Sequence, residues 1–542
     1  DYEAGVWRAD LARMREQDFT DNVVEFMSQK VGTLEGPAQR ALSVASVIGN
    51  EFRLDQLGAL LGDGDAGSDR SAVAQAEDRA LAAIDPARAL GLIYVESGDV
   101  VTGRFSHDRV QQAAYERLAK EERDAIHHRL GKGLAAAYHA GDEAQLFDAT
   151  NHLNHVPVAN LPMEERRPLA ELNLRAARQA RASSAYQAAH AFALAGLQRQ
   201  SSDSFDHDYR LTADLHLEAA ESAFLTGDYA AMERELGTLL VNARDVFDEV
   251  RAYEIRVVAQ NAQNDLVGAM QACLDALAKL GILLDVKPSQ GAVVSQLLRT
   301  KLALRGRSVA ELSALPASRG RHEQAASRLL MSLIGPAYYA SPNLLPLAAF
   351  AVVRLALEKG VCAESATGFA LYGLVLCTLS DYEGAYRYGQ VGVAIADRFD
   401  GTRHANRTRH LYNTHIRIWK EPWIRSADAL ELTHERAYAN GDFEYAAFSG
   451  FMRGGLLGAT GRDLQDVTEY MAKAAAALAE MQQNTSGLTL GIVRQAALNL
   501  REPAPDVPPY ALQGEAYDER VSVAQHREAS DTTNLYCYLT TR

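Results

Sequence analysis

Hydrophobic residues recur three and four positions apart over most of the chain, a spacing that places them on one face of an α-helix. Residues 215–243 show this pattern twice, with Gly227-Asp228 between the two halves. The first half carries Leu215, Ala219, Ala223 and Phe224, and the second carries Met232, Leu236 and Leu240. This segment is therefore predicted to form two amphipathic helices joined by a tight turn.

Similar turns recur further along the chain. Each places a small or polar residue before an aspartate and an apolar or aromatic residue after it, and the aspartates are Asp228, Asp265, Asp381 and Asp442. The separation of the first two is close to a tetratricopeptide period. Helix pairs of this kind bury their apolar faces by stacking on their neighbours. Residues 141–500 are therefore expected to form a tetratricopeptide-like α-α superhelix, followed over 501–542 by a Pro-rich break and truncated further helices.

The first quarter of the chain has a different pattern. Helices are predicted from about residue 20, over 35–49, over 53–62 and from about 71 to 90. Residues 91–107 then predict two short strands around a Ser-Gly-Asp turn, followed by another helix. Helices followed by a two-stranded wing and a further helix are typical of a winged-helix domain, which we expect at 17–140 after a linker over 1–16. The predicted fold class is mostly α.

Charge and composition narrow the possible partners. The formal net charge is −15, and acidic residues outnumber basic ones by 19 to 13 between Asp18 and Lys132. Because DNA phosphates require basic clusters, no nucleic-acid partner is expected. The most apolar stretch, 344–357, contains Pro346 and Arg354 and is too short to cross a bilayer, so it is interpreted as a core helix. A cytoplasmic protein with no membrane association and with reduced, buried cysteines is expected.

Several stretches resemble a family of large bacterial signalling proteins. They include "GPAQRALSVASVIGNEF", "FSHDRVQQAAYERL", "LHLEAAESAFLTGDY" and "HIRIWKEPW", and they keep the order that they have in the family. Those proteins join a serine/threonine-kinase-like domain, a STAND-type ATPase (signal transduction ATPase with numerous domains) and sensor and histidine kinase domains. The matching region lies between the ATPase and the sensor modules. The resemblance implies a winged helix followed by a tetratricopeptide-like superhelix.

The same resemblance implies that further domains belong to this protein. In the family, the ATPase motifs lie before the matching region and the phosphotransfer histidine lies after it. This chain opens on Asp1 and closes abruptly on "LYCYLTTR", so both ends look cut. We interpret the sequence as a piece of a larger protein whose ATPase domain lies before residue 1.

The triplet Ser106-His107-Asp108 stands where the second predicted strand gives way to a helix. A helix N-terminus presents free N–H groups and the positive end of its dipole, which suit an anion. In STAND ATPases a Met-His-Asp motif lies in this context, and its histidine contacts the β-phosphate of ADP. The resemblance therefore implies that His107 contacts phosphate in the intact protein, with Asp108 and Ser106 as helix caps. The alternative is that Ser106 and Asp108 only cap a helix beside an exposed His107.

A second candidate site is the segment "THIRIWKEPW" at 414–423. Arg417, Trp419 and Trp423 have the composition of a binding hot spot, which would lie on the concave face of the superhelix. The alternative is a packing anchor between repeats, since large rings often fill such seams.

Metal binding and catalysis have less support. His152 and His155 could share one helix face, and His404, His410 and His415 cluster in the sequence, but no cysteine or carboxylate accompanies them at a ligand spacing. No metal site, no cofactor and no catalytic residue is therefore expected in this segment.

The predicted function is regulatory. The superhelix would sense a ligand or a partner protein, and the winged helix would couple that event to an upstream ATPase and a downstream histidine kinase of the same chain. The parent protein would be an ATP-dependent protein kinase of two-component signalling that binds ATP or ADP with Mg²⁺. The alternative is a stand-alone tetratricopeptide-like scaffold with no nucleotide switch.

Overall fold

A computed structural model describes residues 2–3, 6–7, 27, 29–62, 70–98, 100–481, 483–503, 508–529 and 531–542. The chain divides into two compact units, unit 1 over Asp1–Asn242 and unit 2 over Ala243–Arg542. Two short strands, β1 (Tyr2–Glu3) and β2 (Val6–Trp7), pair antiparallel near the N-terminus. The helix predicted from about residue 20 lies mostly outside the described residues.

Residues 36–116 of unit 1 combine helices with a small sheet. The elements are α3 (Gly36–Ile48), β3 (Glu51–Arg53), α4 (Leu54–Leu61), α5 (Arg70–Ala89), β4 (Ile93–Glu96), β5 (Thr102–Phe105) and α6 (Asp108–Glu116). The predicted strand pair is confirmed, because β4 and β5 pair antiparallel with Ile93 opposite Phe105. The sequence interpretation missed β3, which pairs with the other edge of β5 and gives the sheet order β3-β5-β4.

A single apolar core joins the helices of this region to the sheet. Its fully buried members include Leu42, Leu57, Ile84, Ile93 and Val110. Gly58 permits the close packing of α4 on α5, because a Cβ at this position would lie 1.8 Å from the carbonyl oxygen of Ala76. The core therefore fixes the strand-to-helix junction at residue 107 from two sides, through Phe105 and Val110.

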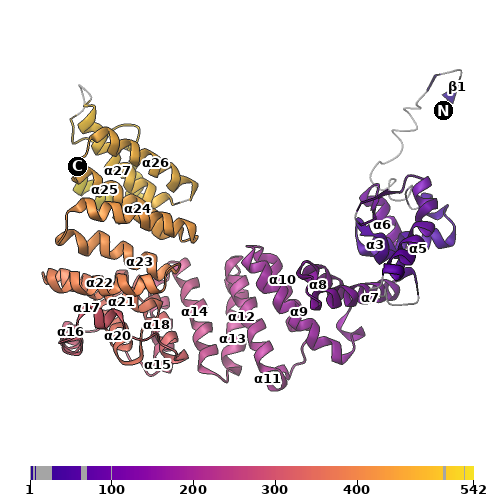
Figure 1. The fold of residues 1–542 in the computed structure, drawn as a ribbon, viewed down its shortest axis with the longest axis horizontal. Helices are drawn as coiled ribbons and strands as arrows, with labels where there is room; N and C mark the ends of the chain where they lie inside the picture. The colour runs from indigo at the N-terminus through magenta and orange to yellow at the C-terminus, as the bar shows by residue number, and fades with distance from the viewer. Residues whose placement is uncertain are drawn as a thin grey trace. The chain divides into compact units, whose positions relative to one another are not determined.

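The rest of unit 1 is helical. It contains α7 (Lys120–His139), the 3₁₀ turn η1 (Glu143–Gln145), α8 (Leu146–His155), the 3₁₀ turn η2 (Val158–Asn160), α9 (Met163–Ala182), α10 (Tyr186–Gln198), α11 (Ser204–His207), α12 (Tyr209–Leu225) and α13 (Tyr229–Asn242). Neighbours in sequence pack together as hairpins, as α9 does with α10 and α12 with α13 (Figure 1). The prediction of two helices in 215–243 is confirmed.

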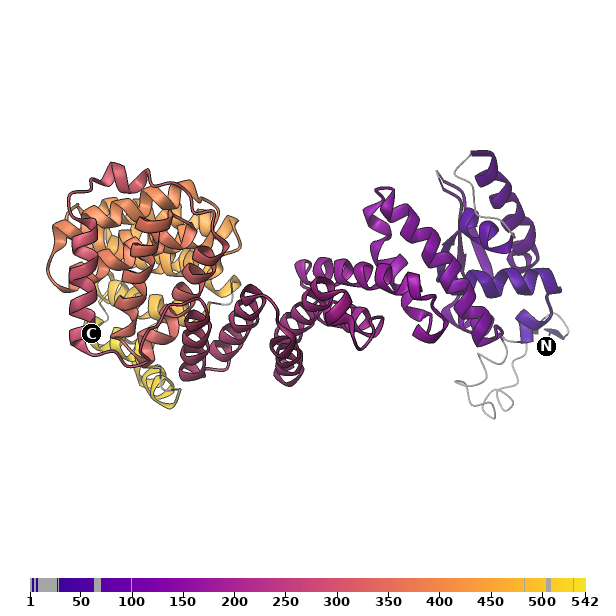
Figure 2. The ribbon, with the colours of Figure 1, turned by 90° about the horizontal axis from the view of Figure 1, so that it is seen from below.

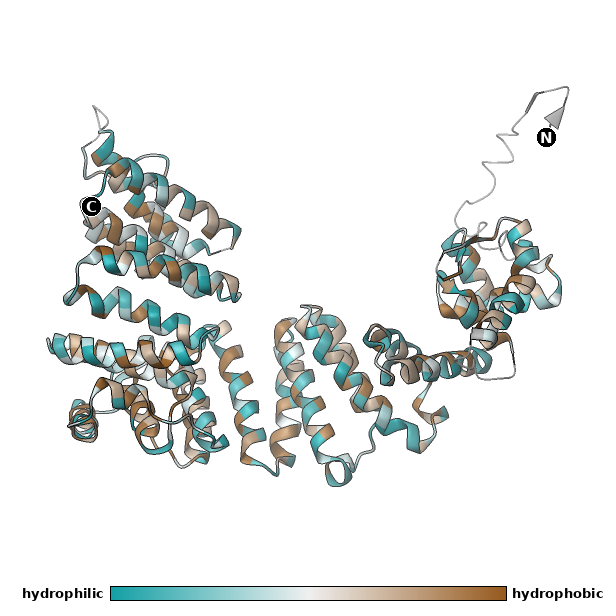
Figure 3. Cartoon of the chain, in the orientation of Figure 1, coloured by the Kyte–Doolittle hydropathy of each residue, from teal (hydrophilic) through white to brown (hydrophobic). Residues whose placement is uncertain are grey.

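The described residues of unit 2 form helices throughout, in the same hairpin arrangement. Its first half contains α14 (Val246–Ala262), α15 (Leu266–Lys279), α16 (Gln290–Leu304), α17 (Val309–Ser313), α18 (Arg321–Ser332), α19 (Ile334–Ala340) and α20 (Leu344–Lys359). Its second half contains α21 (Ala363–Thr378), α22 (Tyr382–Arg398), α23 (Arg403–Leu411), the π-helix η3 (Tyr412–Ile416), the 3₁₀ turn η4 (Arg417–Trp419), α24 (Trp423–Ala439), α25 (Phe443–Ala459), α26 (Leu464–Glu480), α27 (Asn484–Arg501), α28 (Glu519–Glu528) and α29 (Thr532–Thr541). Hydrophobic and hydrophilic residues alternate along these helices, as Figure 3 shows.

The turns that the sequence predicts are confirmed. Each of the four aspartates directly precedes a helix, and the residue before it has a left-handed backbone. These residues are Gly227, Asn264, Ser380 and Gly441, with φ values of 83°, 60°, 62° and 69°. A left-handed residue closes one helix and the next residue starts another, so the chain reverses within a few residues.

The apolar stretch 344–357 lies within α20 and is a core helix, as predicted. Leu344, Phe350 and Val353 are completely buried. Within the described residues, none of the helices combines the length and apolar character needed to cross a membrane. The four cysteines are free thiols, of which Cys273 and Cys362 are buried and Cys377 and Cys537 are partly exposed.

Candidate functional site

His107 occupies the N-cap position of α6, directly after β5. Its backbone is extended, and its Nδ1 accepts a hydrogen bond of 3.1 Å from the backbone N–H of Arg109. An imidazole that accepts through Nδ1 carries its proton on Nε2 when it is neutral. His107 is exposed, so Nε2 is the ring atom that can donate to a ligand.

The capping role predicted for Ser106 and Asp108 belongs to His107 instead. Ser106 donates its backbone N–H to the carbonyl of Leu92, a strand-type contact. Asp108 is the first residue of α6, where its exposed carboxylate faces the positive end of the helix dipole. The N-cap uses a ring nitrogen because the extended conformation of His107 turns its side chain back over the first turn.

A cluster of three histidines lies where the sheet-containing region meets the first helical hairpins. Nδ1 of His127 on α7 lies 2.9 Å from Nδ1 of His152 on α8, and the ring of His155 stacks on His127 at 4.3 Å. The Tyr115 hydroxyl on α6 lies 3.4 Å from Nε2 of His127. We call His127, His152 and His155 the histidine cluster. Burial, with smaller contributions from His155, His152 and Arg123, lowers the pKa of His127 to about 3.

The segment around Trp419 presents aromatic side chains at the surface. Trp419 stacks on Tyr382 with ring centres 4.6 Å apart, and Trp423 donates its indole N–H to the carbonyl of Ile418 at 3.2 Å. Trp419 is 55% exposed and Trp423 is 44% exposed. We call Tyr382, Trp419 and Trp423 the aromatic patch. Trp419 thus contacts a residue of α22 and keeps about half of its side chain at the surface.

Arg417, predicted to act beside the tryptophans, is engaged inside the fold. Its guanidinium donates to Glu421 at 2.8 Å and to the side-chain oxygen of Asn413 at 3.2 Å. Glu421 also accepts from the hydroxyl of Tyr386 at 2.7 Å, and the hydrogen bond from Arg417 lowers the pKa of Glu421 below its usual value. Arg417 therefore holds the loop that presents the aromatic patch.

The π-helix η3 precedes this loop and sets its start. Asn413 donates its side-chain N–H at 2.8 Å to the carbonyl of Arg409, which also accepts the backbone N–H of Tyr412. Burial lowers the pKa values of His410, to about 3, and of His415. Single π turns of this kind are frequent at functional sites.

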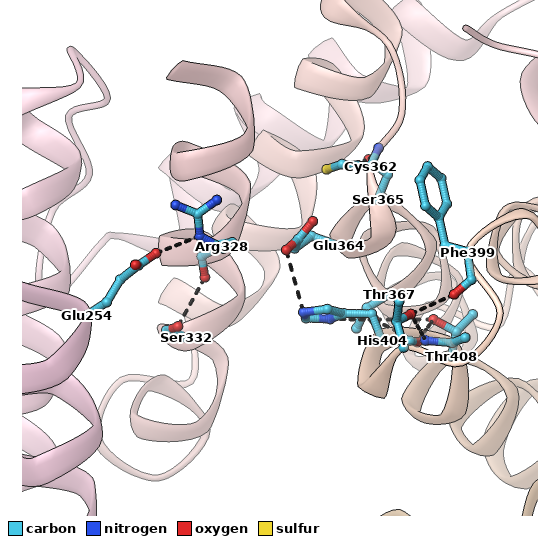
Figure 4. A network of polar contacts seen from close by, with 12 residues as sticks. Glu254, Arg328, Ser332, Cys362, Glu364, Ser365, Thr367, Phe399, His404 and Thr408 are labelled. Atoms are coloured by element: carbon cyan, nitrogen blue, oxygen red, sulfur yellow. Dashed lines mark hydrogen bonds and ion pairs between the residues drawn. The ribbon is translucent and has the colours of Figure 1, made fainter. Parts of the chain in front are cut away.

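Sequence reasoning missed a polar network between α21 and α23, shown in Figure 4. The hydroxyl of Thr367 lies 3.3 Å from Nδ1 of His404 and 3.2 Å from the hydroxyl of Thr408. Glu364 lies 3.7 Å from Nε2 of the same histidine. Burial lowers the pKa of His404, and the nearby carboxylates of Glu364 and Asp442 oppose that shift.

Asp442 extends the network toward α25. Its side chain is 0% exposed, and it accepts a hydrogen bond of 3.0 Å from the side-chain amide of Asn406 on α23. Nε of Arg403 lies 3.7 Å from its other oxygen. We call Glu364, Thr367, His404, Asn406 and Asp442 the carboxylate network. Its members come from three separate segments of the chain, so only Asp442 carried a local signal, as a turn residue.

Of the histidines considered as metal ligands, His152 and His155 both lie against His127. His404 belongs to the carboxylate network, and His410 faces the hydroxyl of Ser449 at 3.2 Å. In the part of the chain that the structure describes, no group of three His, Cys, Asp or Glu side chains is arranged to hold a metal ion.

Most of the chain is similar in sequence to part of a signalling kinase. No family model matches the chain. It is 23% identical over 504 residues to the hybrid signal transduction histidine kinase G of Dictyostelium discoideum. The alignment covers 78% of this chain and 15% of that protein. This chain thus spans about 15% of the length of the curated relative that it matches.

A second similarity is to a solved structure. It is the signal transduction ATPase with numerous domains, with a tetratricopeptide repeat sensor, from Pyrococcus horikoshii. The alignment covers 88% of this chain and 68% of that one at 13% identity, with a TM-score of 0.36. A score of this size does not establish a shared fold.

Proposed function

We propose that this chain is the regulatory arm of a larger signalling protein, in which stacked helical hairpins sense a ligand or a partner protein. The observation that carries this proposal is the similarity to a hybrid histidine kinase over 78% of the chain. The similarity extends over many successive hairpins and is not confined to one short motif. Stacked hairpins support the same reading, because such arrays present extended surfaces for binding. Kinase chemistry would belong to other domains of the parent protein.

The coupling element in this proposal is the region from α3 to α6, interpreted as a winged helix. Its order of one helix, a strand, two helices and two strands, with the strands arranged β3-β5-β4, agrees with that interpretation. The histidine cluster joins α7 to α8, and Tyr115 on α6 contacts His127 of this cluster. A displacement of the hairpins at α8 would therefore shift α6, whose N-cap residue is His107.

His107 would contact a phosphate of ADP bound in the ATPase domain of the parent protein. The local geometry fits one such contact, because Nδ1 is fixed by the N-cap hydrogen bond and Nε2 faces solvent as a donor. Bound ADP with Mg²⁺ would supply the negative charge that favours this contact. Binding of a ligand to the hairpins would break this contact and so release the arm from the ATPase domain.

Two substitutions of His107 separate nucleotide contact from helix capping. His107→Ala removes both the cap and the donor, whereas His107→Asn keeps a good N-cap and removes only the Nε2 donor. In the intact protein, both variants should retain bound ADP less well than the wild type after gel filtration. Retention of ADP by His107→Asn at the wild-type level would reduce His107 to a helix cap. His207→Ala, at an exposed histidine on α11, is the matched control.

The aromatic patch is the surface that we propose for the sensed ligand or partner. Two exposed indoles and a stacked tyrosine offer apolar area that is already rigid, which lowers the entropy lost on binding. Arg417 would act through the loop and not through direct contact, because its guanidinium is already paired with Glu421.

The gene around this sequence distinguishes the proposal from its alternative. An ATPase domain with a P-loop encoded upstream and a histidine kinase domain encoded downstream would support the regulatory arm. A start codon and a stop codon directly at these ends would favour a stand-alone tetratricopeptide-like scaffold for protein partners, without a nucleotide switch.

A further inference from the structure

Helix α16 in unit 2 carries two apolar stripes, and only one of them is buried. Leu304 is completely buried, and Val293 and Leu297 pack against the core on the side of α20. Val294, Leu298 and Leu302 are 54%, 61% and 69% exposed. These three residues are spaced four apart, so they form a continuous row along one side of the helix. We call them the α16 ridge.

The ridge is accessible within unit 2. In Figure 1 helix α16 lies at the outer edge of this unit, and Figure 2 shows it lengthwise at the same edge. Isolated exposed apolar residues need no explanation, but three on one ridge are a contiguous surface of the kind found at interfaces. The ridge is convex, so a matching partner must offer a groove between its own rows of side chains.

The charge around the ridge is opposite in sign to that of the whole chain. Residues 290–307 contain Arg299, Lys301, Arg305 and Arg307 and no aspartate or glutamate, although the chain has a net charge of −15. Lys301 pairs with Asp381 at 3.2 Å. Arg299 and Arg305 are exposed, and within the described ranges neither forms an ion pair.

These cations border the ridge in a regular way. With each residue turned by roughly 100° around the helix axis, Arg299 lies beyond one edge of the ridge and Lys301 beyond the other. Arg305 continues the row past Leu302. A partner that covers the ridge therefore meets positive charge from Arg299 at one edge and from Arg305 beyond Leu302, whereas Lys301 at the other edge is already paired with Asp381.

We propose that the α16 ridge docks an amphipathic helix of a partner protein whose apolar row is flanked by acidic residues. The i, i+4, i+8 spacing of the ridge is the row that interdigitates with the same row of a second helix. Acidic flanks on that helix pair with Arg299 and Arg305, which steers association and fixes its register. A second copy of this chain presenting the same ridge would bring four like charges together. An anionic bilayer would be repelled by the chain as a whole. This surface is separate from the aromatic patch, so either proposal can fail alone.

Four helical peptides of equal length test the proposal on the full chain. They combine an apolar row, present or replaced by Gln, with flanks of Glu or of Lys, and binding is followed by fluorescence anisotropy. Only the peptide with the apolar row and Glu flanks should bind, and its affinity should fall as salt is added. Absence of binding by this peptide, or equal binding of the Lys-flanked peptide, overturns the proposal.

Variants of the chain assign the binding to the ridge. The double substitutions Arg299→Glu with Arg305→Glu, and Leu298→Gln with Leu302→Gln, should each weaken binding about 10-fold or more. Matched controls change exposed residues elsewhere: Arg462→Glu with Lys473→Glu, and Val241→Gln with Val267→Gln. All these positions are exposed, so circular dichroism should show unchanged folding. Equal losses in controls and ridge variants contradict the assignment.

Vesicles provide the remaining arm of the test. The full chain is sedimented with vesicles of phosphatidylcholine alone and with vesicles that also contain phosphatidylserine. The proposal expects no sedimentation in either case. Sedimentation with the phosphatidylserine vesicles that the Leu298→Gln, Leu302→Gln variant abolishes would assign the ridge to an anionic membrane and overturn the helix partner.

Discussion

The two units bury polar side chains in different chemical forms. In unit 1 the histidine cluster brings imidazole rings together, with one histidine nitrogen 2.9 Å from another. In unit 2 the carboxylate network places His404 near Glu364 and Asp442 and gives Asp442 an amide partner. Neighbours of the first cluster all disfavour a proton on His127, whereas neighbours of the second oppose one another at His404. The fold therefore favours the neutral form of His127, whereas His404 lies beside carboxylates that favour its protonated form.

This difference determines which change destabilises the helix contacts made by each group of residues. Contacts between helices that contain a buried neutral imidazole lose stability when low pH protonates the histidine. A contact between helices that depends on the buried carboxylate of Asp442 fails when that carboxylate is removed, because the side-chain N–H of Asn406 then has no acceptor. Arg403 keeps its ion pair with Glu444.

The largest effect is expected from Asp442→Ala. This change removes the acceptor of Asn406 inside a fully buried site, and breaking such a pair from one side costs about 2–4 kcal/mol. The free energy of unfolding is measured by urea denaturation with tryptophan fluorescence, since Trp419 and Trp423 lie in unit 2. Asp442→Asn, which can still accept from Asn406, should lose less. Equal losses for Ala and Asn would show that the hydrogen bond contributes little.

The second effect is acid sensitivity. The pKa values of His127 and His410 are lowered by burial from 6.5 to about 3, so the folded state holds them neutral. The unfolded chain takes up protons below pH 6.5, and stability present above that pH is lost as the pH falls toward 3. At pH 5 the loss should be about 1–2 kcal/mol for each histidine.

The variant His127→Phe tests the contribution of unit 1. It keeps a ring between Tyr115, His152 and His155 and removes the titrating nitrogen. The melting temperature is measured at pH 7.5 and pH 5.0 for both proteins. The difference between the two pH values should shrink in the variant, whatever its stability at pH 7.5. An unchanged difference would mean that the pKa of His127 is not lowered in the folded protein.

Features encoded within a few adjacent residues could be predicted from the sequence. The aspartate turns, the strand pair β4–β5 and the core helix α20 each depend on residues close together in the chain. Strand β3 was missed because it is three residues long and exists only through its pairing with β5, some fifty residues away. The cap of α6 was assigned to the wrong residues because Ser and Asp are far commoner caps than His.

The polar side chains of the site were less predictable. Asp442 has the same local sequence pattern as the other turn aspartates, but its partner Asn406 lies 36 residues earlier on a different helix. Local pattern cannot separate a carboxylate that caps its own helix from one that is buried against another. The exposed tryptophans were found by composition, but the internal role of Arg417 required the π-helix and Glu421, which no periodicity indicates.

The smallest effect is expected at Asp265, the matched counterpart of Asp442. Its carboxylate is an ordinary cap that accepts the backbone N–H of Gly268 at 2.9 Å, as Asp228 does from Ala231 and Asp381 from Gly384. Asp265→Ala should therefore cost about 1 kcal/mol, because the freed N–H at this exposed turn can bond to water. Asp265→Ser, which retains a capping oxygen, should restore most of that loss in the same urea experiment. If Asp265→Ala costs as much as Asp442→Ala, the buried pair with Asn406 adds nothing beyond a turn, and the contrast between capping and buried aspartates is wrong.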